Sequence, residues 1–272
     1  MTIEDAVIYG KKYISSTETK ILIANVMNHD SLEIINYLHQ EMTAEQEDLF
    51  KKLVKARKEN IPVQYLTNSV NFYGLELYVD KSVLIPRFET EELVENTVKF
   101  LNEKFENPKV LDLCCGSGAI GLTIKSKINN SIVTMSDISP EALNVSKINK
   151  DKLNLDVEII ESDLFENIHD KYDCIISNPP YIKSDEEIED IVKNNEPHLA
   201  LYGGVDGLDY YRRILKSIKN YLNDKFLIAF EIGETQKDDI VSIIKDNLDN
   251  VEIITKKDLS GRDRMIFIYN EN

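Results

Sequence analysis

Residues 109–121 read KVLDLCCGSGAIG, a strand-like run that passes through a glycine-rich turn into a helical segment. Gly116 and Gly118 allow a tight turn and a close approach of the backbone to a ligand. The helix that follows directs the positive end of its dipole toward the same ligand. This order of strand, turn and helix is typical of a doubly wound α/β sheet, in which ligands bind beyond the carboxyl ends of the strands.

The same order repeats downstream of this segment. The candidate strands are 110–115 (VLDLCC), 132–137 (IVTMSD), 157–162 (VEIIES), 172–178 (YDCIISN), 226–233 (FLIAFEIG), 251–256 (VEIITK) and 265–270 (MIFIYN). Helical segments separate most of them, which predicts a seven-stranded, mostly parallel, Rossmann-like sheet. Only KDLSGRDR lies between the last two strands, and this is too short for a crossover helix. The last strand is therefore predicted to be antiparallel.

The first part of the chain has a helical pattern. Thr43 and Gln46 have the spacing of a capping box before an amphipathic stretch, and Asp30 can cap a helix over residues 31–40. The apolar residues that fall on one face of these helices are Leu32, Ile35, Leu38, Leu49, Phe50, Leu53 and Val54. We expect them to form the core of a small helical bundle.

A strand-prone stretch follows the helical part. Residues 63–85 contain Gly74 and Asp80 as turn signals, which predicts a short β hairpin, and residues 89–105 predict a helix after Pro86. The predicted organisation is an N-terminal helical domain over 1–62, a β-hairpin linker over 63–86 and an α/β domain over 87–272.

The charge of the chain bears on its partners. Lysine and arginine number 32 against 48 aspartate and glutamate residues, a formal net charge of −16. Proteins that bind nucleic acid usually present a basic surface, because neutralising phosphates releases counterions. The composition therefore argues against direct nucleic-acid binding.

Several features favour a cytoplasmic protein. No apolar run approaches the roughly 18 residues that cross a membrane, and the first residues lack a signal-peptide core. Cys114, Cys115 and Cys174 form neither a disulfide framework nor a metal-binding cluster. We predict buried apolar thiols, no metal site and a monomeric protein.

The glycine-rich turn also matches a dinucleotide motif, G-x-G-x-x-G, at Gly116, Gly118 and Gly121. Asp137 closes the second strand at a distance suited to a ribose-binding acid. Both NAD and S-adenosyl-L-methionine (AdoMet) sites use such an acid to accept hydrogen bonds from ribose hydroxyls. The glycines and Asp137 therefore predict a nucleotide-type cofactor without separating the two.

The fourth strand decides between them, because it ends in Asn178-Pro179-Pro180-Tyr181. An amide or exocyclic amine nitrogen attacks carbon poorly, since its lone pair is delocalised. Two acceptors aimed at its NH₂ protons favour pyramidal geometry, and Asn178 Oδ1 and the Pro179 carbonyl can supply both. The prolines restrict the direction of that carbonyl, and Tyr181 offers a flat face for stacking. This pattern predicts methylation of a planar nitrogen.

Such a reaction needs no strong general base, because the methylated nitrogen becomes acidic once its resonance is lost. The four histidines, His29, His39, His169 and His198, show no catalytic spacing. Catalysis would then consist of positioning and electrostatics, with the nitrogen aligned behind the methyl carbon.

These residues resemble the HemK/PrmC family of peptide chain release factor glutamine methyltransferases along nearly the whole chain. The matching residues are 84–87 (LIPR), 89–91 (ETE), 112–121, Asp137, 178–181, 196–197 (EP), 203–204 with 206–208 (GG and DGL), Tyr211 and 261–264 (GRDR). The resemblance implies a class I AdoMet-dependent methyltransferase domain, with the helical domain recognising the substrate. The implied substrate is the glutamine of the Gly-Gly-Gln motif in class 1 release factors.

The resemblance also implies roles for single residues, with AdoMet as donor and S-adenosyl-L-homocysteine as product. The implied cofactor-binding residues are Cys114, Cys115, Gly116, Ser117, Gly118, Asp137, Asp163, Leu164, Asn178 and Thr90. Asp137 would hold the ribose, and Asp163 and Leu164 would flank the adenine. The implied substrate-binding residues are Asn178, Pro179, Pro180, Tyr181 and Arg87, of which Asn178, Pro179 and Tyr181 are catalytic. Residues 87–91 would close over the site.

The chain departs from the family pattern at three positions. The family usually has glycine at Cys114, proline at Phe88 and often an aromatic residue at Leu164. Adenine would then pack against an aliphatic side chain instead of stacking. These differences concern the geometry of the cofactor site and AdoMet affinity, and they leave the chemistry unchanged.

Three alternatives remain open from the sequence. Asn-Pro-Pro-Tyr also suits the amino groups of adenine or guanine in DNA or RNA, although that reaction needs a positively charged channel. A related family methylates glutamine on a ribosomal protein, but 86–91 (PRFETE) is more similar to the release-factor branch. A non-catalytic binding module would have lost Asn178 or Asp137, and both are present.

Overall fold

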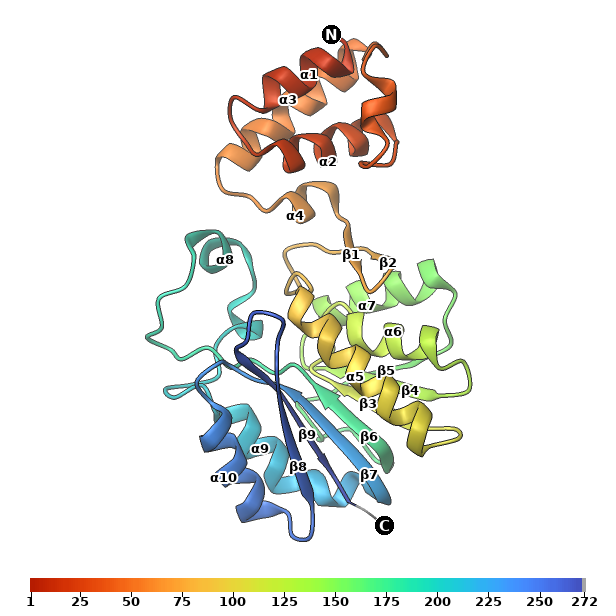
Figure 1. Ribbon diagram of the computed structural model, residues 1–272, viewed down its shortest axis with the longest axis vertical. Coiled ribbons are helices and arrows are strands. Elements are labelled where there is room, and N and C mark those ends of the chain that lie inside the picture. Colours follow the sequence, from red (N-terminus) through yellow and green to blue (C-terminus); the bar gives the residue numbers. More distant parts are fainter. Residues whose placement is uncertain (271–272) are drawn as a thin grey trace. The chain divides into compact units, whose positions relative to one another are not determined.

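The computed structural model describes residues 1–270, which form two compact units (Figure 1). The first, here called the helical unit, comprises Met1–Ser69 and Ile188–Asn195. The second, here called the sheet unit, comprises Val70–Glu187 and the residues from Glu196 onward. Within residues 1–270, no helix is long and apolar enough to span a membrane.

The helical unit is a bundle in which three of the helices begin at side-chain caps. Its elements are α1 (Ile3–Gly10), α2 (Ser16–Met27), η1 (Ile34–Tyr37), α3 (Ala44–Lys58), α4 (Val63–Thr67) and α8 (Asp190–Asn195). Capping boxes start α1, α2 and α3, and the one at Thr43 and Gln46 is the box that the sequence predicts. Leu22, Phe50 and Val54 lie in its buried core.

The predicted helix over residues 31–40 is wrong. This stretch forms a turn followed by the short 3₁₀ helix η1. The carbonyls of Leu38 and Gln40 accept hydrogen bonds from the first residues of α1, which draws the chain out of a helical path. Leu32 is 87% exposed and Ile35 65% exposed, and Leu49 in α3 is 47% exposed, so these three residues do not belong to the core, contrary to the prediction.

The sheet unit contains a seven-stranded sheet in the order β5-β4-β3-β6-β7-β9-β8. The strands are β3 (Lys109–Leu113), β4 (Ile132–Asp137), β5 (Glu158–Glu161), β6 (Tyr172–Ser177), β7 (Leu222–Glu231), β8 (Glu252–Lys257) and β9 (Asp263–Tyr269). Strands β3 to β7 are parallel, and β9 pairs antiparallel with both β7 and β8. The mostly parallel sheet with an antiparallel last strand is confirmed.

Helices cover both faces of this sheet (Figure 1). The helices on one face are α5 (Phe88–Lys104), α6 (Ala119–Lys127) and α7 (Pro140–Leu153), and those on the other are α9 (Asp209–Ser217) and α10 (Lys237–Asn247), with η2 (His198–Ala200) and η3 (Ile218–Tyr221) in the connections. Successive residues of a strand pack into the cores on opposite faces of the sheet. In β6, Cys174 and Ile176 pack on one face and Ile175 packs on the other. This period of two is what a strand buried on both faces requires.

The predicted β hairpin is formed by β1 (Val70–Phe72) and β2 (Leu75–Leu77). Its turn residues, Tyr73 and Gly74, have φ angles of 48° and 82°, as a two-residue hairpin turn demands. Phe72 and Leu77 anchor the hairpin in the core on the α5 side of the sheet.

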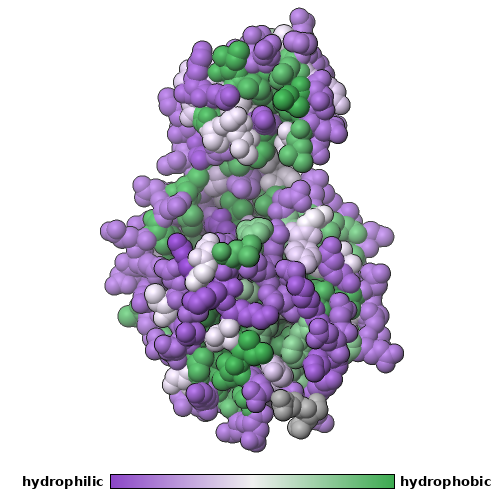
Figure 2. All heavy atoms as spheres, viewed as in Figure 1, coloured by the Kyte–Doolittle hydropathy of each residue, from purple (hydrophilic) through white to green (hydrophobic). Residues whose placement is uncertain are grey.

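Charged and polar side chains dominate the face of the molecule that is drawn in Figure 2. Apolar residues gather there only in small groups. This agrees with the 29% of charged residues in the chain.

Candidate active site

A cavity opens in the sheet unit, lined largely by residues that follow the carboxyl ends of β3, β4, β5 and β6. The strand order switches between β3 and β6: β4 and β5 lie on one side of β3, and β6 and β7 lie on the other. Open α/β sheets bind ligands at such a topological switch point. The lining residues are Ser82–Leu84, Pro86, Thr90, Cys114–Ser117, Ala119, Ile120, Asp137–Ser139, Ala142, Ser162–Leu164, Asn178, Pro180, Pro197, Leu199, Ala200 and Tyr210.

Side chains from neighbouring elements hold the glycine-rich turn through hydrogen bonds to its main-chain groups. The Gly116 amide donates to Asp137 Oδ2 at 2.8 Å, and Ser146 Oγ donates to the Gly116 carbonyl at 2.7 Å. Asn149 Nδ2 donates to the Ser117 carbonyl at 2.9 Å. A Cβ on Gly116 would meet no protein atom within 4 Å, so the backbone here is open for a ligand to approach.

Cys114 stands where a glycine is usual in the family that the sequence resembles. Its φ of 64° lies in the left-handed region, which costs a residue with a side chain roughly 1–2 kcal/mol. Burial raises the pKa of all three cysteines, Cys114, Cys115 and Cys174, well above the ordinary range. These thiols are therefore protonated at neutral pH. Cys115 and Cys174 are buried, as predicted, whereas Cys114 is half-buried and lines the cavity.

Asp137 lies at the end of β4 and faces the cavity. Its carboxylate accepts the Gly116 amide through Oδ2 and the Ser139 amide through Oδ1, at 2.8 and 3.0 Å. Burial raises its pKa, and these two hydrogen bonds oppose the rise. Each oxygen keeps a second lone pair, so Asp137 can hold the loop and still accept ribose hydroxyls.

The predicted adenine-binding residues follow β5. Leu164 is buried with a φ of 52° and lines the cavity together with Asp163. Both Asp163 oxygens accept from Arg213 Nη2 at 2.7 Å. Tyr210, which the sequence analysis missed, also lines the cavity and provides an aromatic ring.

Asn178, Pro180 and Thr90 meet at the cavity wall, as the predicted site requires. Asn178 Nδ2 donates to Thr90 Oγ1 at 3.3 Å. Within residues 1–270, neither Asn178 Oδ1 nor the Pro179 carbonyl takes part in a hydrogen bond. The two acceptors on which the predicted chemistry depends are therefore not occupied by a donor of the described chain. Asn178 lines the cavity, whereas Pro179 is buried and is not among the lining residues.

The Pro180 and Tyr181 carbonyls are held by Gln236 and by a loop that contains Gly203 and Gly207. Gln236 Nε2 donates to the Tyr181 carbonyl at 2.8 Å. A Cβ on Gly203 would lie 2.5 Å from the Pro180 carbonyl oxygen, and one on Gly207 would lie 2.3 Å from that of Tyr181. Only glycine allows the loop to approach so closely, and this packing fixes the backbone of the turn.

Arg87 does not line the cavity. Its guanidinium pairs with Glu196, a carboxyl whose side chain is 2% exposed and which also accepts the Ile85 amide at 3.1 Å. This pair ties the segment before α5 to the segment that carries Pro197 and Leu199 at the cavity wall. The substrate-binding role of Arg87 stays a prediction.

Two buried carboxyls lie near the site, Glu196 and Glu231. Glu196 belongs to the matching motif at 196–197 but was given no role there, and Glu231 was missed by sequence reasoning. Glu231 ends β7 and accepts from Thr90 Oγ1 at 2.5 Å and from the Tyr181 hydroxyl at 3.3 Å. An acidic residue at the carboxyl end of a buried strand was the available signal. Burial raises the pKa of Glu231, while the Thr90 hydrogen bond and the Arg264 charge lower it.

The sheet order, the open glycine turn and the Asn-Pro-Pro-Tyr turn together define a class I AdoMet-dependent methyltransferase. The cavity fits AdoMet, because it combines an open main-chain turn, an acid beside it and apolar walls. Comparison with known sequences agrees. The Methyltransferase small domain model matches residues 90–204, and the PrmC N-terminal domain model matches residues 13–67.

Curated relatives identify the family. The release factor glutamine methyltransferase of Clostridium acetobutylicum is 39% identical over 98% of both chains. The enzyme of the same name from Streptococcus pneumoniae is 40% identical over 90% of this chain and 88% of its own. This chain belongs to the release factor glutamine methyltransferase family.

A solved structure agrees with the fold. The 16S rRNA N2 G1207 methyltransferase of T. thermophilus, in complex with AdoMet and guanosine, has a TM-score of 0.54 and 14% identity. The match covers 75% of this chain and 50% of that chain.

Proposed function

We propose that this protein transfers a methyl group from AdoMet to the side-chain amide nitrogen of a glutamine. The acceptor is the glutamine in the Gly-Gly-Gln motif of class 1 peptide chain release factors. The observation that carries the proposal is the pair of acceptors that no donor of the described chain occupies, Asn178 Oδ1 and the Pro179 carbonyl, beside a cofactor-type cavity. Membership of the family supports the choice of glutamine.

The acceptors act on the substrate nitrogen before and during transfer. Asn178 Oδ1 and the Pro179 carbonyl each accept one proton of the glutamine NH₂ group. Holding both protons on one side favours a pyramidal nitrogen, whose lone pair is then directed away from the acceptors. When bound, AdoMet supplies an electrophilic methyl group on a sulfonium. The same hydrogen bonds strengthen as positive charge develops on the nitrogen, which lowers the barrier.

The surrounding residues orient and enclose the amide. Tyr181 follows the acceptors in the chain, and its hydroxyl donates to Glu231 at 3.3 Å. Burial raises its pKa, so the phenol is neutral, and we propose that its ring stacks on the planar amide. The methylated nitrogen carries an acidic proton that passes to water, so no side chain has to act as a strong base. The chain thus contributes orientation and charge stabilisation.

The partner and compartment follow from this function. We propose that the protein acts as a monomer on release factors in the cytoplasm, and that its N-terminal helical domain, residues 1–62, recognises the substrate. Arg87 would contact the substrate after release from Glu196. The formal charge of −16 weighs against a nucleic-acid substrate.

The test is methyl transfer from labelled AdoMet to a purified class 1 release factor. The matched control is the same factor with the Gly-Gly-Gln glutamine changed to alanine, and DNA and ribosomal protein serve as competing acceptors. We expect label on the intact factor alone. Label on DNA or ribosomal protein in preference to the factor would overturn the substrate, while label on the alanine variant would overturn the position.

A further inference from the structure

Glu231 occupies a place that the proposed mechanism does not use. It is 1% exposed and ends β7, the strand next to β6, which leads into Asn178. Its two carboxylate oxygens accept from two different hydroxyls: Oε2 from Thr90 at 2.5 Å and Oε1 from Tyr181 at 3.3 Å. Both hydroxyls belong to residues of the predicted site.

The direction of these hydrogen bonds determines how Asn178 is oriented. A carboxylate only accepts hydrogen bonds, and a hydroxyl has a single proton to donate. Because the Thr90 hydroxyl donates to Glu231, its oxygen can only accept from Asn178. The Asn178 amide must then turn Nδ2 toward Thr90, which leaves Oδ1 for the substrate. A flipped amide would present NH₂ to the NH₂ group of the acceptor glutamine.

The positive charge of Arg264, in β9 of the hairpin between β8 and β9, acts on this carboxylate. Arg264 donates through Nε to Asp258 Oδ2 at 3.2 Å and through Nη1 to the Ile232 carbonyl at 3.1 Å. Its Nη1 also lies 3.5 Å from the Tyr181 hydroxyl oxygen. Asp258 in turn accepts the Arg262 amide at 3.0 Å, so the hairpin is fixed at both ends. A buried carboxylate needs such a partner to stay ionised.

We propose that Glu231 is a positioning residue for methyl transfer. Acting through Thr90, it fixes the flip state of the Asn178 amide so that Oδ1 faces the acceptor nitrogen; through Tyr181 it fixes the ring beside that nitrogen. The inference rests on the proposed function, since the required orientation is that of a hydrogen-bond acceptor for an NH₂ group. Arg264, held by Asp258, supports the charge on Glu231.

The decisive variant is Glu231→Gln, which keeps the size of the side chain and removes its acceptor-only character. A glutamine amide can donate to Thr90, and the Thr90 hydroxyl can then donate to Asn178 Oδ1 and favour the flipped amide. We expect kcat for the release factor to fall about 10²-fold, as for loss of a transition-state hydrogen bond. The Kd for AdoMet, measured by calorimetry, should stay within about twofold.

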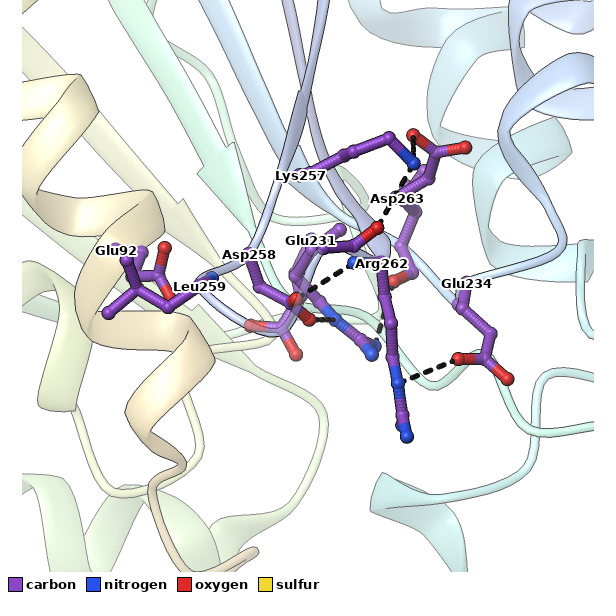
Figure 3. A network of polar contacts seen from close by, with 12 residues as sticks. Glu92, Glu231, Glu234, Lys257, Asp258, Leu259, Arg262 and Asp263 are labelled. Atoms are coloured by element: carbon purple, nitrogen blue, oxygen red, sulfur yellow. Dashed lines mark hydrogen bonds and ion pairs between the residues drawn. The ribbon is translucent and has the colours of Figure 1, made fainter.

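Glu234→Gln is the matched control. Glu234 lies three residues along the chain, is half-exposed and pairs with Arg262 at 3.2 Å (Figure 3). The same chemical change there should leave kcat unaltered. The hydrogen bonds that join Glu231, Thr90 and Asn178 are here called the relay. A comparable fall in kcat for Glu234→Gln would show that the effect is not specific to the relay and would overturn the proposal.

Thr90 provides an independent test of the relay. Thr90→Val removes the hydroxyl and should lower kcat by a similar factor, while Thr90→Ser should recover most of the loss. In the Thr90→Val background, Glu231→Gln should lower kcat far less than in the wild type, because the relay is already broken. Fully additive effects would overturn the relay. If Glu231→Gln does not fold, the comparison of Thr90→Val with Thr90→Ser decides alone. Equal kcat values for these two variants would overturn the relay.

The outcomes separate this inference from the proposed function. If the wild type does not methylate release factor at all, the proposed function fails. If the wild type methylates it and Glu231→Gln has the same kcat, only the positioning role fails. A Glu231→Gln protein that loses AdoMet binding in proportion to activity would make Glu231 a general structural residue and overturn the proposal.

Discussion

The two halves of the site are held in different ways. In the cofactor half, Asp137 and Ser146 bind main-chain groups of Gly116, so side chains fix the backbone of one continuous loop. In the substrate half, Asn178 is held by Thr90, which is bound to a residue 141 positions further along the chain, Glu231. A loop fixed through its backbone tolerates changes of its own side chains. A relay of side chains depends on the identity of every member.

The largest effect is expected in the substrate half. Asn178→Ala removes one of the two acceptors and should lower turnover about 10²–10³-fold. AdoMet affinity should stay nearly intact, because the loop around Gly116 does not depend on Asn178. Single-turnover kinetics and calorimetry measure the two quantities. Equal rates for the variant and the wild type would refute the acceptor role of Asn178.

The corresponding change in the cofactor half should act on binding. Asp137→Ala removes a charged hydrogen-bond acceptor and the support of the Gly116 amide, and should weaken AdoMet binding by roughly 1.5–3 kcal/mol. At saturating AdoMet, kcat should change far less than in Asn178→Ala. Calorimetry tests this, and an unaltered Kd would show that Asp137 does not contribute to the cofactor half.

Arg87 tests whether the segment before α5 is held by its ion pair. Arg87→Ala leaves the buried Glu196 carboxyl without its cation and should lower the free energy of unfolding by about 1–3 kcal/mol. Adding Glu196→Gln should recover part of the loss. Urea denaturation of the single and double variants measures this. A midpoint unchanged by Arg87→Ala would argue that the pair contributes no stability.

The last change, at Asp112 beneath the cofactor loop, alters the pH dependence of stability. Asp112 is fully buried and accepts the Gly121 amide at 2.8 Å, and burial raises its pKa to about 7. Between about pH 4 and pH 7 the folded state therefore binds more protons at Asp112 than the unfolded state. Its contribution to stability falls as the pH rises through this window and is constant above it.

Asp112→Asn, which cannot ionise, removes this contribution. The difference in unfolding free energy between the variant and the wild type should shift in favour of the variant from pH 4 to pH 7. Denaturant unfolding across this range measures the difference. A difference that does not vary with pH would show that Asp112 has the same pKa in both states.

Sequence reasoning succeeded where the signal is local. The strands, the antiparallel hairpin at KDLSGRDR and the meeting of Gly116, Asp137 and Asn178 at one edge of the sheet follow from periodicity and from the geometry of parallel sheets. A Rossmann-like sheet brings the carboxyl ends of its strands together whatever the details of packing. The place of these three residues at the cavity could therefore be predicted, and their roles toward a cofactor stay predictions.

The failures arise where contacts join distant parts of the chain. The helical period of residues 31–40 was overridden by hydrogen bonds to α1, which left Leu32 exposed. Glu231 and Tyr210 belong to the site only because folding brings them there. The ion pair between Arg87 and Glu196 was not predicted either. None of these contacts has a periodic or spacing signature.

The insertion of β9 between β7 and β8 has a consequence for the order in which the protein is made. β9 is synthesised after the other six strands of the sheet, so β7 and β8 leave the ribosome without the neighbour that will join them. Arg264, which lies in β9, also arrives after every member of the relay. A nascent chain can thus complete its cofactor loop early, but it gains a charged neighbour for Glu231 only at the end of assembly.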